Sequence, residues 1–229
     1  MELPKPTLDK EKALYKQGFS FVAGIDEAGR GAWAGPVVAA AVILPPDQAN
    51  LAEVLAPVND SKQMSPPQRE RAFDLIQTVA MAIGIGVGSH RCIDRRRIVA
   101  ATRQAMARAL TNLSLPPDYL LIDALPLPSI PLPQQAFPKA DSISLSVAAA
   151  SIIAKVSRDR LMGLLDQRYS GYQFARHKGY GTKAHQAALS RLGPCPIHRY
   201  SFAPIRALTI AHSPEAQKQP GSASSPLDE

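Results

Sequence analysis

Two adjacent carboxylates beside a glycine-rich turn are the residues of this chain best suited to do chemistry. Asp26 and Glu27 follow the apolar residues 21–23, and a Gly-Arg-Gly sequence occupies residues 29–31. Charged groups at such a place are costly to bury unless they are paired or bind a metal ion. Glycine lets the backbone approach a ligand where a Cβ atom would obstruct it. The segment therefore indicates either a metal site that meets a phosphate-bearing substrate, or a structural ion pair at a strand end.

Two further carboxylates end or precede apolar segments. Asp123 follows the apolar run 119–122, at the end of an expected buried strand, where α/β sheets place functional groups. Asp141 precedes an alanine-rich helix candidate, and an ordinary helix-capping role is the alternative for it, as capping of a loop is for Asp123. Four oxygen ligands without His or Cys suit Mg²⁺ or Mn²⁺ rather than zinc. Two such ions about 3.5–4 Å apart can activate a water and stabilise the leaving oxygen in phosphodiester cleavage.

The first pair of carboxylates sets a condition on the backbone. Successive residues of a strand point to opposite faces of its sheet. Asp26 and Glu27 can therefore serve one site only if the strand bends, and Gly29 permits such a bend.

The elements that must position these groups follow from apolar periodicity and turn residues. The predicted strands are 21–29 and 34–44 as a pair, 79–88 with small glycines for close packing, 119–123, and the short 135–137. The predicted helices are a short lead-in within 1–18, 66–78 with a Ser65/Gln68 capping box, 94–113, 144–169, and 183–192 capped by Thr182. These elements predict a mixed α/β domain.

Composition narrows the class of protein. The 229 residues are 45% hydrophobic and 20% charged, as in ordinary globular proteins, and the net charge of +7 suits a polyanionic partner such as nucleic acid. Two isolated cysteines argue against a disulfide framework and a zinc site. The N-terminus has no signal-peptide pattern and no apolar run could span a bilayer, so we expect a cytoplasmic protein with no membrane partner.

Several blocks of the sequence, taken in order, resemble the motifs of the bacterial ribonuclease HII family. The blocks cover about residues 20–206 and comprise residues 24–31, 34–38, 59–62, 121–123, 139–141, 149–156, 158–159, 177–182 and 198–202. The resemblance implies a ribonuclease H-like fold, a five-stranded mixed sheet flanked by helices with a helical C-terminal region. We accordingly expect a lead-in over 1–18, a catalytic domain over 19–208, and a disordered tail over 209–229.

The resemblance also implies an activity and its ligands. The expected reaction is endonucleolytic cleavage of RNA in RNA–DNA hybrids, and incision 5′ of single ribonucleotides in duplex DNA, giving 3′-hydroxyl and 5′-phosphate ends. Such a protein has a role in removing ribonucleotides from DNA. The implied ligands of two divalent ions, Mn²⁺ or Mg²⁺, are Asp26, Glu27, Asp123 and Asp141.

Recognition of the substrate is expected to fall on other residues. Only the 2′-hydroxyl distinguishes ribose from deoxyribose, and the backbone of Gly29, Arg30 and Gly31 can approach it closely. The resemblance implies that Tyr180 stacks on the following sugar and senses the RNA–DNA junction, although a tyrosine in such a turn is more often a packing residue. The lysines expected to touch phosphates, or otherwise to be merely solvated, are Lys62, Lys155 and Lys178.

Two positions depart from the family pattern. Ala32-Trp33 stands where the family often has Pro-Leu. The Trp33 indole either alters the local packing or contacts the minor groove of the substrate. Ala140 replaces a common glycine, which is tolerated unless that position needs a positive φ.

Two rival functions remain open at this point. One is another metal-dependent nuclease of the same fold, such as a junction resolvase, and the other is a basic, non-catalytic nucleic-acid-binding module. The carboxylates argue against the second, because acidic groups repel phosphates unless a metal ion bridges them. We expect a monomer.

Overall fold

A single five-stranded mixed sheet forms the centre of the protein in the computed structural model, which describes residues 5–211. The strands are β1 (Val22–Ala28), β2 (Val37–Ile43), β3 (Ala82–Gly88), β4 (Tyr119–Asp123) and β5 (Gln134–Phe137). Their order is β3-β2-β1-β4-β5; β1, β2 and β3 are antiparallel neighbours, whereas β4 runs parallel to β1 and β5 runs parallel to β4. The predicted mixed sheet and all five of its strands are therefore confirmed.

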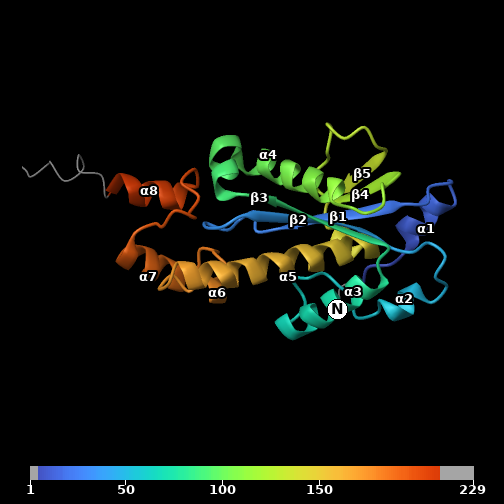
Figure 1. The fold of residues 1–229 in the computed structure, drawn as a ribbon, viewed down its shortest axis with the longest axis horizontal. Helices are drawn as coiled ribbons and strands as arrows, with labels where there is room; N and C mark the ends of the chain where they lie inside the picture. The colour runs from blue at the N-terminus through green and yellow to red at the C-terminus, as the bar shows by residue number, and fades with distance from the viewer. Residues whose placement is uncertain (1–4, 212–229) are drawn as a thin grey trace, which may run out of the picture.

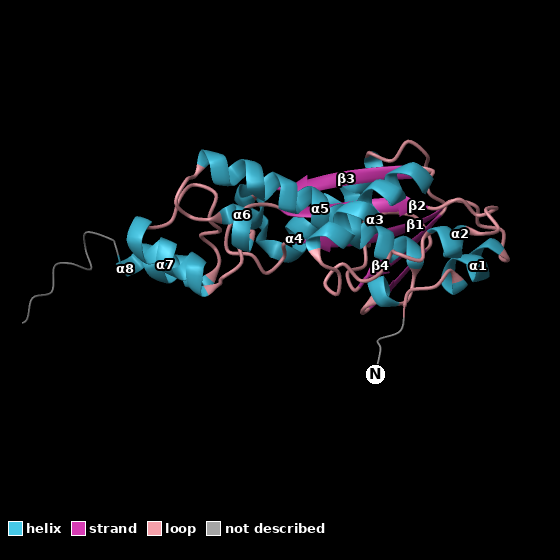
Figure 2. Cartoon of the chain, turned by 90° about the horizontal axis from the view of Figure 1, so that it is seen from below, coloured by secondary structure: helices cyan, strands magenta, loops and turns pink. Residues whose placement is uncertain are grey.

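Long helices cover both faces of the sheet (Figure 1). Helix α4 (His90–Thr111) packs on β3 and β2, and α5 (Leu145–Arg168) packs on β1 and β2 from the other side, with α3 (Pro66–Val79) against α5. The shorter elements are α1 (Asp9–Tyr15), α2 (Leu51–Val54), the 3₁₀ turn η1 (Ala140–Ser142), α6 (Phe174–His177), α7 (Lys183–Leu192) and α8 (Ala203–Ala211). Both views place α6, α7 and α8 at one end of the molecule and α1 and α2 at the other (Figures 1 and 2).

Side-chain caps account for the starts of α3, α4, α5 and α7. Ser65 and Gln68 form the predicted capping box of α3. Helix α4 begins four residues before the predicted position because the Ser89 side chain accepts a hydrogen bond from the Cys92 amide, and the backbone kinks at Arg97, where φ is 67°. Helices α2, α6 and α8 are not among the predicted elements. Helix α8 runs past residue 208, and the remainder of the tail expected to be disordered lies outside the described residues.

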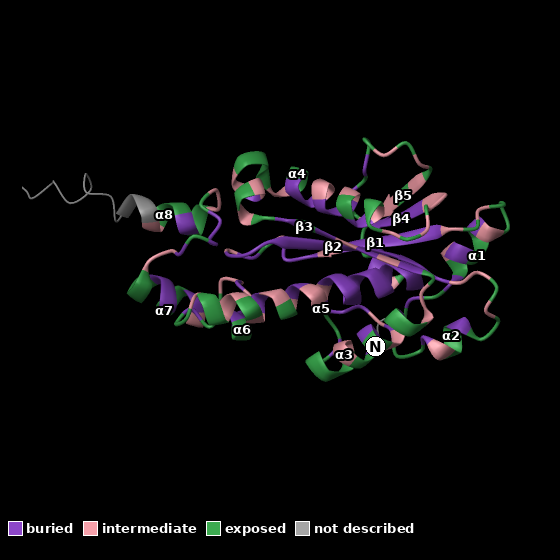
Figure 3. Cartoon of the chain, viewed as in Figure 1, coloured by how far each residue is buried: buried purple, intermediate pink, exposed green. Residues whose placement is uncertain are grey.

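Glycines allow the helices to approach the sheet closely, as predicted for 79–88. A Cβ atom at Gly84 or Gly86 would lie 2.0 Å from a backbone carbonyl oxygen of α4, and one at Gly24 would lie 2.2 Å from the backbone of Ser146 in α5. The N-terminal half of α5 is consequently buried, whereas its C-terminal half is partly exposed (Figure 3). This contact fixes the position of α5 relative to β1, the strand that carries Asp26 and Glu27.

Helix α1 also anchors the start of α5. Glu11 is fully buried, and its Oε1 accepts hydrogen bonds from the Ser144 hydroxyl (2.6 Å), the Ser146 hydroxyl (2.7 Å) and the Ser146 amide (2.9 Å). A carboxylate at a helix N-terminus is favoured by the unpaired amides and by the helix dipole. The segment before residue 19 thus packs against the turn that carries Asp141. None of the helices described by the structure is long and apolar enough to cross a membrane.

Candidate active site

A cavity of about 330 Å³ opens where the C-terminal ends of β1 and β4 meet the middle of α5. Its lining includes three of the four predicted carboxylates, the Gly-Arg-Gly turn, Tyr180 and two of the predicted lysines. The lining residues are Asp26, Glu27, Ala28, Gly29, Arg30, Gly31, Ser61, Lys62, Asp123, Ser151, Lys155 and Tyr180. The tertiary structure therefore brings together segments that are more than 150 residues apart in the sequence.

The adjacent carboxylates Asp26 and Glu27 both reach this cavity. Strand β1 ends at Ala28, and Gly29 turns the chain with φ at +92°. Asp26 is 3% exposed, and its Oδ1 accepts a hydrogen bond of 2.6 Å from the Glu27 amide. The Glu27 side chain is 7% exposed, and its Oε1 accepts a hydrogen bond of 3.2 Å from Arg30 Nη1.

Burial and mutual repulsion make these carboxylates hard to ionise without an added cation. Burial raises the pKa of Asp26 well above its ordinary value, and the neighbouring Glu27 and Asp123 raise it further. Burial also raises the pKa of Glu27, an effect that the charge of Arg30 partly opposes. The pKa of Asp123 is raised by burial as well, although its Oδ1 accepts a hydrogen bond of 2.9 Å from the Ala140 amide.

Asp141 joins the cluster through a lysine. It lies in η1, it is buried, and its Oδ2 accepts a hydrogen bond of 2.7 Å from Lys62 Nζ. Burial alone would lower the pKa of Lys62, but the hydrogen bond and charge of Asp141 outweigh this and raise it. The Lys62 side chain is 71% exposed, so solvent reaches the lysine side of this ion pair, whereas the Asp141 side chain is 3% exposed.

The chemistry of these groups fits a hard divalent cation. In the described part of the chain, no three His, Cys, Asp or Glu side chains already form a cluster able to hold an ion. The acidic groups at the cavity are nevertheless carboxylates, whose oxygens Mg²⁺ and Mn²⁺ prefer, and its lining includes no His or Cys. Glu27 Oε2 is buried and has no hydrogen-bond partner. A cation would satisfy this oxygen and relieve the repulsion at Asp26.

The two glycines of the turn have different surroundings. At Gly29 a Cβ atom would lie 1.9 Å from Nε of Arg158, whereas at Gly31 it would meet nothing within 4 Å. Gly29 is thus required by the fold itself. Gly31 faces open space at the cavity, so no contact within the described residues accounts for its lack of a side chain.

Two buried arginines, to which the sequence analysis gave no role, hold this turn in place. Arg199 is fully buried and donates to the carbonyl oxygens of Gly29 (2.7 Å), Arg30 (2.8 Å) and Gly35 (2.9 Å). Burial, with the nearby charge of Arg158, lowers the pKa of Arg199 to about 9. Arg199 therefore remains charged at neutral pH.

Arg158 supports the same loop from helix α5. It donates to the carbonyl oxygens of Pro36 (2.9 Å), Lys178 (2.9 Å) and Ala34 (3.3 Å). Both arginines bind backbone carbonyls instead of carboxylates, which directs those carbonyls inward. In the described residues, the amides of Arg30 and Gly31 donate to no other group. The only signal in the sequence for this role was the place of each arginine within a motif block, 158–159 for Arg158 and 198–202 for Arg199.

Tyr180 faces the cavity from the loop between α6 and α7. Its ring lies 5.4 Å from the guanidinium of Arg158 and 5.9 Å from Lys155 Nζ. Lys155 lines the cavity and pairs with Asp159 at 2.8 Å. Lys178 does not line the cavity but a neighbouring groove between α3, α5 and α6.

The two departures from the family pattern have structural explanations. Trp33 packs against the C-terminal helices, where its indole covers Gly181 so closely that a Cβ atom there would lie 2.2 Å from Cζ2. Its ring also lies 5.8 Å from His185. Ala140 has no positive φ; the left-handed residue is its neighbour Lys139, with φ at 59°. Alanine is therefore compatible with this turn.

The three buried histidines behind Tyr180 serve the packing of the C-terminal helices. The rings of His177 and His185 stack with centroids 4.4 Å apart, and Nε2 of His185 lies 3.0 Å from Nε2 of His198. Burial lowers the pKa of both His185 and His198 to about 4, so these rings are neutral at physiological pH. Lys178 and Tyr180 follow directly on His177 in the chain, so this packing positions their loop.

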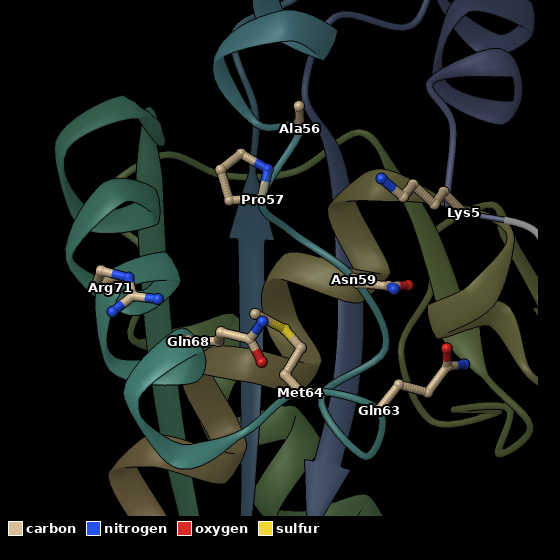
Figure 4. A pocket seen from close by; sticks show the side chains of 8 residues that line it. All are labelled: Lys5, Ala56, Pro57, Asn59, Gln63, Met64, Gln68 and Arg71. Carbon is tan, nitrogen blue, oxygen red and sulfur yellow. The ribbon is translucent and has the colours of Figure 1, made fainter.

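A second cavity, of about 460 Å³, is lined in part by the loop 59–63 (Figure 4). Asn59 and Gln63 of that loop line it, together with Lys5 and with Arg71 of α3. Its lining contains no carboxylate, so this cavity does not offer the ligands of a hard divalent cation.

The fold and the carboxylate cavity define a ribonuclease H-like enzyme. Ribonuclease H2 from Pyrococcus horikoshii OT3 superimposes with a TM-score of 0.69 at 27% identity, over 86% of this chain and 99% of that one. The Bst ribonuclease HIII in complex with Mn²⁺ shares the fold, with a TM-score of 0.63 at 21% identity over 87% and 73% of the two chains.

Sequence comparison narrows the class further. The model of the ribonuclease HII family matches residues 23–205. Ribonuclease HII of Geobacter metallireducens is 54% identical over 196 residues, which are 86% of this chain and 90% of that protein. The chain belongs to the ribonuclease HII family and is an endoribonuclease. Both rival functions, the junction resolvase and the non-catalytic binding module, are thereby set aside.

Proposed function

We propose that this protein cleaves the RNA strand of RNA–DNA hybrids and incises duplex DNA on the 5′ side of single embedded ribonucleotides. The observation that carries the proposal is the convergence of Asp26, Glu27 and Asp123 on one cavity with the Gly29–Gly31 turn and Tyr180. Membership of the ribonuclease HII family supports the hybrid as substrate. The incision at single ribonucleotides rests on the turn and the tyrosine.

The proposed ligands of two divalent ions, Mg²⁺ or Mn²⁺, are Asp26, Glu27, Asp123 and Asp141. When bound, such ions supply the positive charge that makes water a nucleophile at neutral pH and that stabilises the leaving oxygen. The buried carboxylates support this assignment, because burial and the neighbouring Glu27 and Asp123 raise the pKa of Asp26 and because Glu27 Oε2 has no hydrogen-bond partner. The expected products have 3′-hydroxyl and 5′-phosphate ends.

Discrimination between ribose and deoxyribose is assigned to the backbone of the turn. Arg158 and Arg199 hold the loop carbonyls inward, which leaves the amides of Arg30 and Gly31 free to donate to a 2′-hydroxyl. Rigid donors placed in advance lose little conformational entropy on binding. Tyr180, held beside Arg158 and Lys155, offers its ring to the sugar that follows. All of these groups come from one chain, so we propose that a monomer is active.

The decisive experiment is incision of a labelled DNA duplex that holds one ribonucleotide, with Mg²⁺ or Mn²⁺, beside an all-DNA duplex. A single cut 5′ of the ribonucleotide, absent from the control and from an Asp26→Asn variant, is the expected result. Cutting of long hybrids alone would refute the incision at single ribonucleotides. No cutting of either substrate with either ion would refute the proposal as a whole.

A further inference from the structure

A cationic groove runs beside the carboxylate cavity, between α3, α5 and α6. It has a volume of about 590 Å³, and its cationic residues are Arg69, Lys155, Arg160, Arg176 and Lys178. Glu70 and Asp159 are the two carboxylates in its lining, so the groove carries an excess of three positive charges.

The pairing of these groups shows where the excess lies. Arg160 pairs with Glu70 at 2.5 Å, and Lys155 pairs with Asp159 at 2.8 Å. The other three cations have no carboxylate partner among the described residues. Arg69 donates to the carbonyl oxygens of Ser61 (2.9 Å) and Met64, Lys178 Nζ lies 3.3 Å from the carbonyl oxygen of Asp159, and Arg176 is exposed.

The groove adjoins the cavity through two of its residues, Lys155 and Arg69. Lys155 lines both of them. Arg69 of the groove holds the carbonyl of Ser61, which itself lines the cavity. An extended polyanion whose scissile phosphate lies in the cavity would therefore meet the unpaired cations of the groove next.

We propose that this groove binds backbone phosphates of the duplex that flank the cleavage position. This inference rests on the proposed function, because it takes the duplex bound in the groove to be the same molecule that is cleaved in the cavity. Phosphate contacts position a nucleic acid without reading its sequence, and each neutralised phosphate releases counterions. The groove thus sets how far the duplex must extend from the ribonucleotide for full affinity.

The test measures the salt dependence of binding. The double variant Arg176→Gln/Lys178→Gln is compared with the wild type by fluorescence anisotropy in EDTA, on a long duplex with one central ribonucleotide. Two lost phosphate contacts should reduce the slope of log Kobs against log salt by about 1.8, at about 0.9 per contact. Duplexes shortened stepwise on one side of the ribonucleotide or on the other should show which side contacts the groove, because wild type and variant should bind alike once that side is too short to reach it.

Two control variants separate this effect from general loss of charge. Lys16→Gln removes an exposed cation at the end of α1, at the far end of the molecule from α6 (Figures 1 and 2) and should leave the slope unchanged. Arg176→Lys keeps the charge and should also retain the slope. Equal unfolding temperatures establish that the double variant is folded.

The outcomes distinguish this inference from the proposed function. An unchanged slope in the double variant, while the wild type still incises the ribonucleotide duplex with Mg²⁺, would overturn the groove alone. A reduction equal to that of Lys16→Gln would overturn it as well. A wild type that cuts no ribonucleotide-containing substrate would refute the proposed function irrespective of the slope.

Discussion

Gly29 and Gly31 flank the same arginine, yet an alanine side chain would meet very different surroundings at the two positions. At Gly29 the backbone has φ at +92°, and the new Cβ atom would lie 1.9 Å from Nε of Arg158. Displacing the Arg158 side chain is energetically costly, because it is fully buried and its guanidinium donates to three backbone carbonyls. At Gly31 the Cβ atom would meet no heavy atom within 4 Å.

The magnitude follows from these contacts. A left-handed conformation costs an alanine about 1–2 kcal/mol. Displacing Arg158 would break at least one hydrogen bond from a charged donor, worth about 1.5–3 kcal/mol. Gly29→Ala should therefore lower the free energy of unfolding by about 2.5–5 kcal/mol, which corresponds to a fall of about 5–20 °C in the unfolding temperature for a chain of this size. Gly31→Ala should change the stability by no more than about 0.5 kcal/mol.

The assay combines thermal unfolding by circular dichroism with incision of a duplex that holds one ribonucleotide. Gly31→Ala should unfold like the wild type but incise about tenfold more slowly, because its methyl group obstructs the approach of the sugar to the turn. The loss of one hydrogen bond between the turn and the 2′-hydroxyl accounts for a factor of that size. If Gly29→Ala unfolds within about 2 °C of the wild type, the reasoning on Arg158 is wrong. If Gly31→Ala incises at the wild-type rate, the turn does not contact the substrate as proposed.

Three further predictions concern other parts of the site. Burial and neighbouring carboxylates raise the folded-state pKa of Asp26 above its ordinary 3.8, so ionisation above that value destabilises the folded state, and stability falls as pH rises through this window. Asp26→Asn should therefore unfold at a higher temperature than the wild type at pH 7 in EDTA, and this difference should vanish toward pH 3.8. Added Mg²⁺ or Mn²⁺ should raise the unfolding temperature of the wild type only. Equal unfolding temperatures of the two proteins in EDTA would contradict this prediction. Arg199→Lys should lower the free energy of unfolding, measured in urea, by about 2–4 kcal/mol, because one ammonium cannot reproduce the guanidinium that reaches three carbonyls. An unchanged midpoint of urea unfolding would show that those hydrogen bonds contribute little to stability. Tyr180→Ala should slow incision at single ribonucleotides more than cleavage of long hybrids, and equal losses on the two substrates would argue against a role in sensing the junction.

Much of the architecture could be predicted from the sequence because it depends on neighbouring residues. The apolar run at 119–122 predicted β4, and the Ser65/Gln68 capping box predicted the start of α3. Each of these signals acts over a few residues, through hydrophobic periodicity or a hydrogen bond within one turn. The candidate site was predictable for a related reason: carboxylates that end apolar strands must gather at one edge of a shared sheet. The structure places Asp26, Glu27 and Asp123 on one cavity.

Other features are decided only by the tertiary structure. Arg158 and Arg199 hold the Gly29–Gly31 turn and the loop that follows it through backbone carbonyls, which carry no mark in the sequence. Glu11 caps a helix that begins more than 130 residues later, and Lys178 faces the groove instead of the cavity. A side chain's environment depends on which distant segments pack against it, and this packing is settled by the burial of the whole core. The sequence by itself thus determined the five strands, the longer helices and the reactive groups, whereas the long-range packing decided which groups meet and what holds them in place.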